Sequence, residues 1–373
     1  MKIAIFLMDL GGGGAERVMI NLAGGFLDLG MEVDLVLVKA EGPYLSKLSP
    51  NINVVALNCS RLISSLPSLI TYLRKNRPSV LMSALEDTNL VALWARKLAN
   101  VTTQVIVTVH NNLSCESQNA TQLKRKLTPQ LVKLFYPWAD QIVAVSKGVA
   151  QDLIKIGLPH QKVHAIYNPI ITTDLLEKLK EKLNHPWFLP EQPPVIIGVG
   201  RLTKQKDFST LIHAFAQVKK QKLSRLLLLG DGEERSALEK LVKSLDLTQD
   251  VQFMNFVANP YIYMAKASVL VLSSAWEGFG NVLVEAMISG TAVVSTNCES
   301  GPAEILANGK YGKLVSVGNV KEMAKAILET LANPLEIEML KERANEFTLN
   351  NSIIGYRLLL ENFPIQGFEL PKI

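Results

Sequence analysis

The sequence predicts an α/β protein of two domains, each built on a doubly wound parallel sheet. Three observations carry this prediction. Strand-length apolar runs alternate with amphipathic segments of helix length, which is typical of βαβ units. The runs are almost continuously apolar, as strands are when helices cover both faces of their sheet. The alternation breaks once, in a proline-rich stretch near mid-chain, and then restarts, and 373 residues are enough for two hydrophobic cores.

The first domain is predicted over residues 1–170. The strand-like runs are KIAIFLM, EVDLVLV, INVVAL, SVLMSA, TQVIVTVH and DQIVAVS. Helices are expected through ERVMINLAGGFLDLG, LPSLITYLRKN and NLVALWARKLA. Gly30 follows the first of these and is a candidate for the left-handed residue that ends a helix.

A second domain is predicted over residues 195–345, after a linker at 171–194. YNPI and NHPWFLPEQPPV carry the prolines that break the pattern. The strand-like runs then resume with VIIGVG, RLLLLG, VQFMNF, SVLVLSS, TAVVST and GKLVSV. A last helix, about 349–363, has no strand after it and could cover either domain; we expect it to pack back on the first. Ligands of such sheets bind beyond the carboxyl ends of the strands, so two facing domains predict a cleft lined by these loops.

Composition narrows the class of protein. Apolar residues make up 48% and charged residues 20%, as in a globular protein. No apolar run is long enough to span a bilayer, and the amino terminus lacks the pattern of a signal peptide. Cys59, Cys115 and Cys298 are too far apart for a disulfide framework or a zinc knuckle, so we expect a reducing cytoplasm.

The positive charge is concentrated in the first half of the chain. Residues 1–185 hold 20 Lys and Arg against 14 Asp and Glu, whereas the remainder holds 19 against 20. This asymmetry indicates that the first half meets something anionic, and ordinary solvated charge is the alternative.

A run of four glycines, in MDLGGGGAERV, follows the first strand. A dinucleotide fingerprint would need a third glycine where Glu16 or Arg17 stands, and no GK[ST] follows for a phosphate loop. What remains is a bare-backbone turn that lets a ligand approach closely, or a merely flexible turn.

Two cations follow the first strand of the second domain, in GVGRLTKQKDF. Arg201 and Lys206 could neutralise a diphosphate, the first as a fork and the second as a point charge, while Lys204 is expected to be solvated. Ordinary surface charge is the alternative for a loop of this kind.

Glu277 and Glu285 stand eight positions apart in WEGFGNVLVEAMISG. One continuous helix would separate them by about 12 Å, more than the roughly 5–9.5 Å between the carboxylates of a glycosidase. Gly278 and Gly280 favour a helix that begins near Asn281 instead. Its first N–H groups, at 279–282, would then hold an anion, and Glu285 would accept hydrogen bonds from a ribose diol.

These segments carry a resemblance to a known family. EGFGNVLVEAM resembles the E-x7-E motif of the retaining GT-B glycosyltransferases of family 4. GRLTKQKDFSTLIHAF is similar to their Arg/Lys diphosphate loop, LLLLGDGEERSALEKL to the next strand–turn–helix, GPAEIL and GKYGKLVSVGN to the segment after it, and GGAERVMINLA to their amino-terminal loop. The resemblance covers about residues 2–363 and implies two Rossmann-like domains.

The resemblance implies a role for each matching residue. Arg201 and Lys206 would stabilise the departing nucleotide diphosphate, and Glu277 would contact a hydroxyl of the donor sugar. His110, after VIVTVH, matches a strand-end histidine beside that sugar, although a lone histidine is more often structural. The donor-binding residues would be Gly12, Gly13, Phe279, Gly280, Asn281, Val282 and Glu285. Asn255 is a departure, because many members have glycine there, and it leaves the recognition of uracil in doubt.

The implied reaction is the transfer of a hexose or N-acetylhexosamine from a nucleotide diphosphate, most simply UDP, to a glycan or lipid-linked glycan. The family retains the anomeric configuration, and the leaving phosphate would itself take the proton of the acceptor. No D-x-D triplet or histidine cluster is present, so neither a divalent metal nor another cofactor is expected, and nucleic acid is not an expected partner. A UDP-sugar epimerase or hydrolase of two similar domains, and a non-catalytic sugar-binding protein, are the alternatives.

The segment 122–138, QLKRKLTPQLVKLFYPW, is a candidate for contact with an anionic membrane. Leucines recur at helical spacing beside cations, and Pro129 predicts two short helices in place of one. A helix packed on the protein's own core is the alternative. The predicted location is therefore the cytoplasm, with contact to the inner face of the membrane as an extension.

Overall fold

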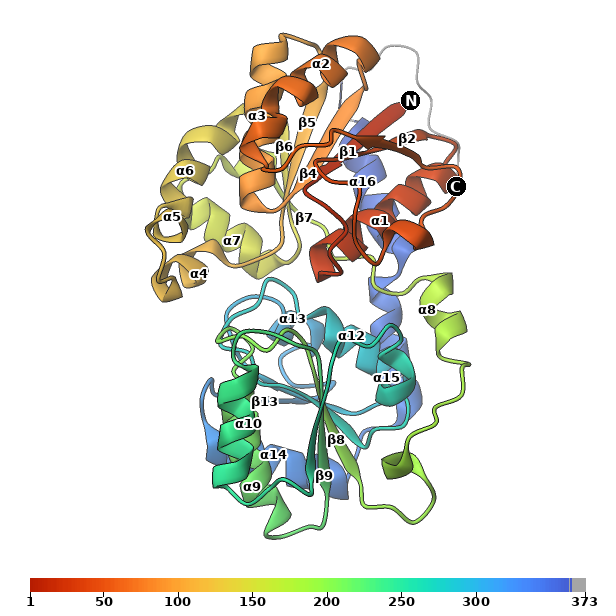
Figure 1. The fold of residues 1–373 in the computed structure, drawn as a ribbon, viewed down its shortest axis with the longest axis vertical. Coiled ribbons are helices and arrows are strands. Elements are labelled where there is room, and N and C mark those ends of the chain that lie inside the picture. Colours follow the sequence, from red (N-terminus) through yellow and green to blue (C-terminus); the bar gives the residue numbers. More distant parts are fainter. Residues whose placement is uncertain (362, 364–373) are drawn as a thin grey trace. The chain divides into compact units, whose positions relative to one another are not determined.

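The structure is a computed structural model that describes residues 1–361 and 363. The chain divides into two compact units. The first comprises Met1–Pro169 together with the chain from Leu349 on, and the second comprises Ile170–Thr348. Figure 1 shows that each unit is a sheet with helices on its faces. The chain therefore enters the second unit once and returns to the first at its last helix.

In the part of the chain described, the first unit contains a seven-stranded parallel sheet in the order β3-β2-β1-β4-β5-β6-β7. Its strands are β1 (Lys2–Leu7), β2 (Glu32–Leu37), β3 (Asn53–Ala56), β4 (Val80–Ala84), β5 (Gln104–Val109), β6 (Gln141–Ala144) and β7 (Val163–Ala165). Its helices are α1 (Gly14–Asp28), α2 (Leu66–Asn76), α3 (Glu86–Ala99), α4 (Leu113–Asn119), α5 (Leu123–Lys126), α6 (Thr128–Phe135), α7 (Lys147–Ile156) and α16 (Leu349–Glu361). Short 3₁₀ turns lie at Leu45–Lys47, Ile63–Ser65, Tyr136–Trp138 and His160–Lys162.

The second unit, described throughout residues 170–348, contains a six-stranded parallel sheet in the order β10-β9-β8-β11-β12-β13. Its strands are β8 (Val195–Val199), β9 (Arg225–Leu229), β10 (Val251–Met254), β11 (Val269–Leu272), β12 (Val293–Thr296) and β13 (Lys313–Val315). Its helices are α8 (Thr173–Lys178), α9 (Phe208–Lys219), α10 (Arg235–Ser244), α11 (Tyr261–Met264), α12 (Asn281–Ile288), α13 (Pro302–Ile305), α14 (Val320–Ala332) and α15 (Ile337–Ala344), with 3₁₀ turns at Pro186–Phe188 and Asn345–Phe347.

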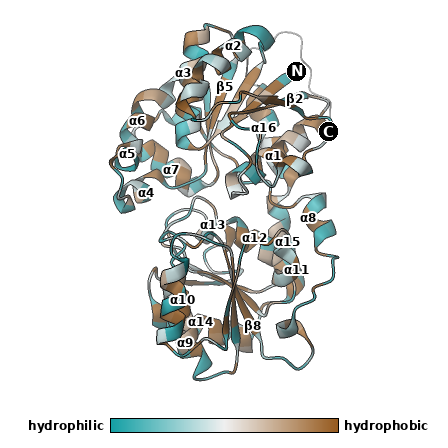
Figure 2. Ribbon diagram, viewed as in Figure 1, coloured by the Kyte–Doolittle hydropathy of each residue, from teal (hydrophilic) through white to brown (hydrophobic). Residues whose placement is uncertain are grey.

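The central strands are buried, as their apolar runs predict, whereas the edge strand β3 is largely exposed. β4 and β11 are buried at every position, and Figure 2 shows the strands of both sheets in the brown of hydrophobic residues. Helices cover both faces of such sheets, so water does not reach these central strands. The predicted fold class, two doubly wound parallel sheets, is confirmed.

Local signals also place several element ends. Helix α1 ends at Asp28, and Gly30 follows with a left-handed φ of +73° while its N–H donates to Leu27. This is the predicted role of Gly30. In the segment 122–138 the chain forms two short helices, α5 and α6, which break at Leu127 with Pro129 in the first turn of α6. The two predicted short helices are therefore present.

The last helix packs on the first unit. The ring of Tyr356 on α16 meets the ring of Phe26 on α1 edge to face, with 6.0 Å between their centres. Gly25 allows this approach, because a Cβ there would lie 2.6 Å from the side chain of Ile353. The helix ends at Glu361, and Phe363 is buried in the same core, while residue 362 lies outside the described residues.

The segment 171–194, predicted as a linker, is part of the second unit. It contains α8 and the 3₁₀ turn Pro186–Phe188, and the His185 ring lies against Phe188 and Tyr263. The guanidinium of Arg225 stacks over Trp187 at 5.0 Å. The prolines therefore mark a change in local structure, and the unit itself begins at Ile170 and ends at Thr348 in place of 195 and 345.

Candidate functional site

Two of the candidate catalytic residues meet in the second unit. The Nζ of Lys206 forms an ion pair with Oε1 of Glu277, a residue 71 positions further along the chain. The Oγ of Ser274 donates to the same carboxylate oxygen at 2.6 Å. Glu277 is buried, with 7% of its side chain exposed, whereas Lys206 is 21% exposed. The carboxylate is thus fixed in position by a cation and a hydroxyl.

The backbone also joins the two loops that carry these side chains. Gln205 accepts a hydrogen bond from the N–H of Ala275 at 2.8 Å, and its side-chain amide donates to the carbonyl of Trp276 at 3.0 Å. Ser273 Oγ donates to the carbonyl of Lys206 at 2.7 Å. The loop after β8 and the loop after β11 are therefore held together on both sides of the ion pair.

Helix α12 begins at Asn281, as the glycines predict, and Glu277 precedes it. Gly280 is the N-cap residue with a left-handed φ of +98°. The peptide dipoles of α12 place partial positive charge at this end, next to the loop that carries Glu277. The loop 278–282 and the Lys206 ammonium thus contribute positive potential to one end of the sheet, which suits an anion.

Glu285 lies in the second turn of α12 and is 4% exposed.

Cys298, in the loop after β12, is buried. Burial and the Glu277 carboxylate raise the pKa of its thiol to about 12. The thiol is therefore protonated at neutral pH and is no nucleophile there.

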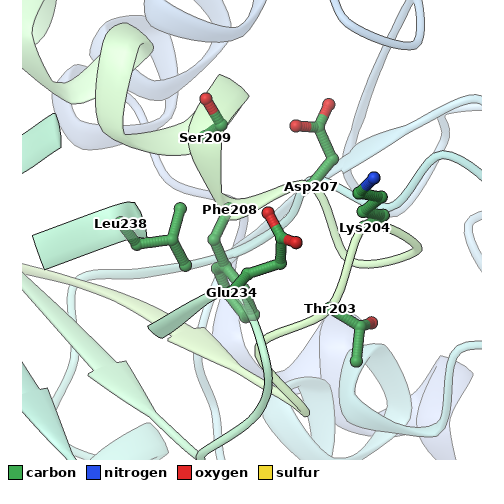
Figure 3. Close-up of a pocket in the computed structure, with 7 residues that line it drawn as sticks. All are labelled: Thr203, Lys204, Asp207, Phe208, Ser209, Glu234 and Leu238. Atoms are coloured by element: carbon green, nitrogen blue, oxygen red, sulfur yellow. The ribbon is translucent and has the colours of Figure 1, made fainter. Parts of the chain in front are cut away.

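Arg201 is exposed on the same loop as Lys206. A small cavity of about 190 Å³ lies beside this loop (Figure 3). Its lining is Thr203, Lys204, Asp207, Phe208, Ser209, Glu234 and Leu238. This lining includes neither Lys206 nor Glu277, and the volume is below the roughly 300 Å³ of small-molecule sites. The cavity is therefore separate from the candidate site.

Asn255, the departure from the family pattern, is held by a neighbour. Its side-chain oxygen accepts a hydrogen bond from Arg235 Nη1 at 2.7 Å, and the same guanidinium lies over Phe253 at 5.7 Å. The next residue, Phe256, is 55% exposed. The end of β10 thus presents a fixed amide and an exposed ring.

Gly12 and Gly13 lie in the first unit, between β1 and α1. Gly12 has a left-handed φ of +94°, and its carbonyl accepts a hydrogen bond from the Tyr44 hydroxyl at 3.3 Å. Gly13 is the N-cap residue of α1. The backbone at Gly42 packs closely against the start of this loop, because a Cβ on Gly42 would lie 2.1 Å from the carbonyl oxygen of Leu10.

His110 follows β5 in the first unit. Its Nε2 lies 2.9 Å from Thr108 Oγ1. Desolvation by the surrounding protein lowers the pKa of the imidazole to about 4. His110 is therefore neutral at neutral pH and can exchange a hydrogen bond with a sugar hydroxyl without carrying charge.

The surface of 122–138 is apolar, and part of its charge is paired. Exposed large side chains there are Leu123, Leu127, Leu134 and Trp138, between 42% and 70% exposed. Lys124 pairs with Asp87 at 2.7 Å, and Arg125 lies 3.6 Å from Glu86 and 3.7 Å from Glu116. The basic character of this face is therefore weaker than the sequence alone suggests.

The described residues contain neither a metal-binding cluster nor a membrane-spanning helix. Over 1–361 and 363, no group of three or more His, Cys, Asp or Glu side chains is arranged to hold a metal ion. Within the same residues, no helix has the length and apolar character needed to cross a membrane.

Sequence reasoning missed the residues that support the site. Ser274 and Gln205 act through short hydrogen bonds between loops from different strands, and their residue types give no signal by themselves. Their position at strand ends was the available clue.

The comparisons with known proteins agree with the fold. Residues 12–174 match the model of Glycosyltransferase Family 4, and residues 180–347 match the model of Glycosyl transferases group 1. Among solved structures, the Anabaena protein HepE in complex with UDP and glucose has a TM-score of 0.80 and 22% identity, covering 97% of this chain and 100% of that chain. Sucrose-phosphate synthase from Thermosynechococcus elongatus has a TM-score of 0.80 and 22% identity, covering 97% and 98%.

Relatives found by sequence similarity are also named as glycosyltransferases. The chain is 32% identical, over 87% of its length and 89% of the relative, to an N-acetylgalactosaminyltransferase of Campylobacter jejuni named for its acceptor, N-acetylgalactosamine-N,N'-diacetylbacillosaminyl-diphospho-undecaprenol. It is 27% identical to LpsE of Rhizobium meliloti, named as a lipopolysaccharide core biosynthesis glycosyltransferase, with 90% of each chain covered. With both units matched and a relative above 30% identity across most of its length, the chain belongs to the GT-B glycosyltransferases of family 4.

Proposed function

We propose that this glycosyltransferase moves a hexose or N-acetylhexosamine from a UDP-sugar to a glycan or lipid-linked glycan, with retention of the anomeric configuration and without a divalent metal. The observation that carries the proposal is the contact between Lys206 and Glu277 next to the N-terminus of α12. A cation and a helix N-terminus suit a diphosphate, and a buried carboxylate can accept a hydrogen bond from a sugar hydroxyl.

The proposed mechanism follows the movement of charge. The bond between the anomeric carbon and the β-phosphate breaks toward an oxocarbenium-like state, and negative charge grows on the diphosphate. Lys206, Arg201 and the amides of Phe279, Gly280, Asn281 and Val282 stabilise this charge where it develops. Glu277 accepts a hydrogen bond from a hydroxyl of the sugar and orients the ring. The acceptor oxygen forms the new bond to the anomeric carbon on the face that the phosphate leaves, and its proton passes to the leaving phosphate. The positive charge that a metal would supply thus comes from the protein.

In the first unit we assign to Gly12, Gly13 and His110 a role in binding the sugar substrates. The bare backbone of the glycines permits close approach, and the neutral imidazole provides a hydrogen bond. In the second unit we assign the nucleobase to the end of β10, beside Asn255 and Phe256.

The donor class rests on the fold and on the neighbours. The Anabaena neighbour contains UDP and glucose, and two Campylobacter relatives are named for transfer to diphospho-undecaprenol-linked acceptors. The test is a UDP-release assay in EDTA, over a panel of UDP-hexoses and UDP-N-acetylhexosamines, with and without a diphospho-undecaprenol-linked N-acetylgalactosaminyl acceptor. Acceptor-dependent release supports transfer, whereas acceptor-free isomerisation of the donor or acceptor-independent hydrolysis supports the epimerase or hydrolase alternative.

The ribose assignment gives a prediction of its own. Glu285→Gln removes the charged acceptor of the ribose hydroxyls, and hydrogen bonds to charged groups contribute about 1.5–3 kcal/mol. We therefore expect the dissociation constants of UDP and of uridine, measured by calorimetry, to rise by about 10- to 150-fold each. Unchanged affinity for both ligands would contradict the assignment.

We also propose that 122–138 rests on an anionic membrane surface. Leu134→Asp places a charge on the exposed stripe and should weaken binding to phosphatidylglycerol vesicles about tenfold in a sedimentation assay. Leu223→Asp is the matched control, because Leu223 is 67% exposed in the second unit and Leu134 is 63% exposed. Equal binding of both variants would exclude this surface.

A further inference from the structure

The side chain of Arg343, at the end of α15, binds the backbone of another segment. Its Nε donates to the carbonyl of Ile305 at 2.8 Å, and its Nη2 donates to the carbonyl of Glu304 at 2.5 Å. Both carbonyls belong to the end of α13, which is a single turn. A helix leaves its last carbonyls without partners in the helix, and a cation is favourable at this end. Arg343 therefore caps α13.

The guanidinium is itself fixed in place. Its central carbon lies over the ring of Tyr311, with 5.5 Å to the ring centre, and over the ring of Phe347, with 5.1 Å. Its Nη1 forms an ion pair with Glu346, and only 12% of the side chain is exposed. Two ring contacts, an ion pair and two hydrogen bonds to carbonyls together restrain the orientation of this planar group.

The other end of α13 touches the loop at the head of α12. Gly301, the N-cap residue of α13, has a φ of +87°, and a Cβ there would lie 2.0 Å from the carbonyl oxygen of Phe279. Any other residue at 301 would push this loop away. The backbone of α13 therefore sets the position of Phe279.

Two side chains, those of Ile305 and Phe347, also pack against the loop at the start of α12. The Ile305 Cδ1 lies 3.9 Å from the place where a Cβ on Gly280 would be. The Phe347 ring, under the guanidinium, meets the Phe279 ring edge to face, with 5.4 Å between centres. Arg343 thus reaches two adjacent residues of the loop, one through Ile305 and one through Phe347.

We propose that Arg343 is a positioning residue for the donor: by capping α13 and holding Phe347, it fixes the amides of 279–282 at the place where the diphosphate binds. The inference rests on the proposed donor class. In this proposal Arg343 acts through α13 and Phe347 and does not contact the ligand itself. Replacing Arg343 should therefore weaken the binding of the diphosphate and leave the binding of the nucleoside unchanged, because the proposal assigns the ribose and the base to other residues.

The test compares UDP with uridine. Arg343→Lys keeps the charge but cannot span two carbonyls with one planar fork. We expect the calorimetric dissociation constant of UDP to rise about tenfold, with that of uridine changed less than twofold. The matched control is Arg357→Lys in α16, whose side chain is 17% exposed and pairs with Glu361. The control should leave both constants within twofold of wild type.

A merely structural role would give a different result. If Arg343→Lys lowers the melting temperature but leaves the ratio of the UDP and uridine constants unchanged, the proposal is wrong. Glu346→Gln provides a second variant should the first fail to fold, since Glu346 is 58% exposed and orients the same guanidinium; a ratio raised about threefold supports the proposal, and an unchanged ratio overturns it. Wild-type protein that binds UDP no more tightly than uridine would instead contradict the donor class.

Discussion

Replacing Lys206 by methionine is expected to lower kcat by about 10²–10³-fold, with the KM for the UDP-sugar changed much less. In the proposed mechanism the ammonium faces the diphosphate, whose charge is greatest in the transition state, so its loss should raise the barrier more than it weakens ground-state binding. The buried Glu277 would also lose its ion-pair partner, and its carboxylate would then be held by Ser274 alone among the contacts described above. Initial rates over a range of donor concentrations separate the two constants.

Lys204→Met is the control for this prediction. Lys204 lies on the same loop, is exposed and lines the separate cavity of Figure 3. Its replacement should leave kcat within threefold. If Lys206→Met and Lys204→Met have the same kcat, the loop contributes no specific charge to the reaction and the proposed role of Lys206 is lost.

The second large effect that we expect is a pH-dependent change in the free energy of unfolding when Glu86 is replaced. Glu86 begins α3 in the first unit and is 4% exposed, and its Oε1 has no hydrogen-bond partner among the described residues. Burial, with a smaller contribution from the Glu116 carboxylate, raises the pKa of Glu86 to about 7 from its ordinary 4.5. Arg125, 3.6 Å away, offsets only part of this.

A raised carboxyl pKa means that the folded protein binds more protons than the unfolded chain between about pH 4.5 and pH 7. The free energy of unfolding therefore falls as the pH rises through this window and is lower by a constant amount above it. At about 1.36 kcal/mol per pH unit, the loss is about 3 kcal/mol. Glu86→Gln removes the charge, so the variant should be more stable than wild type by about 3 kcal/mol at pH 8 and by little at pH 4.

Urea denaturation at the two pH values, followed by a probe in the first unit, measures this difference. Asp87→Asn is the matched control, because Asp87 is the next residue of the same helix and is more exposed, at 32% of its side chain. The control should shift stability by less than 1 kcal/mol at both pH values. A Glu86→Gln variant less stable than wild type at pH 8 would show that the carboxylate is stabilised in the folded protein.

Local features of this chain could be predicted from sequence because their causes are local. Gly30 ends α1, and the start of α12 at Asn281 follows from the glycines before it, since backbone freedom at single positions determines both. The ion pair of Lys206 with Glu277 was not predicted, although the family resemblance implies that both residues contact the donor. This ion pair depends on the contact between the loop after β8 and the loop after β11, and the residue spacing within either loop does not determine that contact.

Other features had no sequence signal. In the sequence, Arg343 is one of several charged residues of an amphipathic helix. Its hydrogen bonds go to backbone carbonyls about 40 positions earlier, and these give no sequence signal because every residue has a carbonyl. The prolines of 171–194 predicted a linker, but the aromatic contacts of His185 bind that segment to the second unit. In both cases packing between distant segments decided the outcome.

Proton NMR of a complete reaction shows whether the protein transfers a sugar and which anomer it forms. The mixture would contain the full chain, EDTA, a UDP-α-N-acetylhexosamine and the diphospho-undecaprenol-linked N-acetylgalactosaminyl acceptor. We expect the signals of UDP and of a new α-anomeric product to grow together at equal rates. A β-anomeric product would rule out retention, and UDP formed with free sugar alone would rule out transfer.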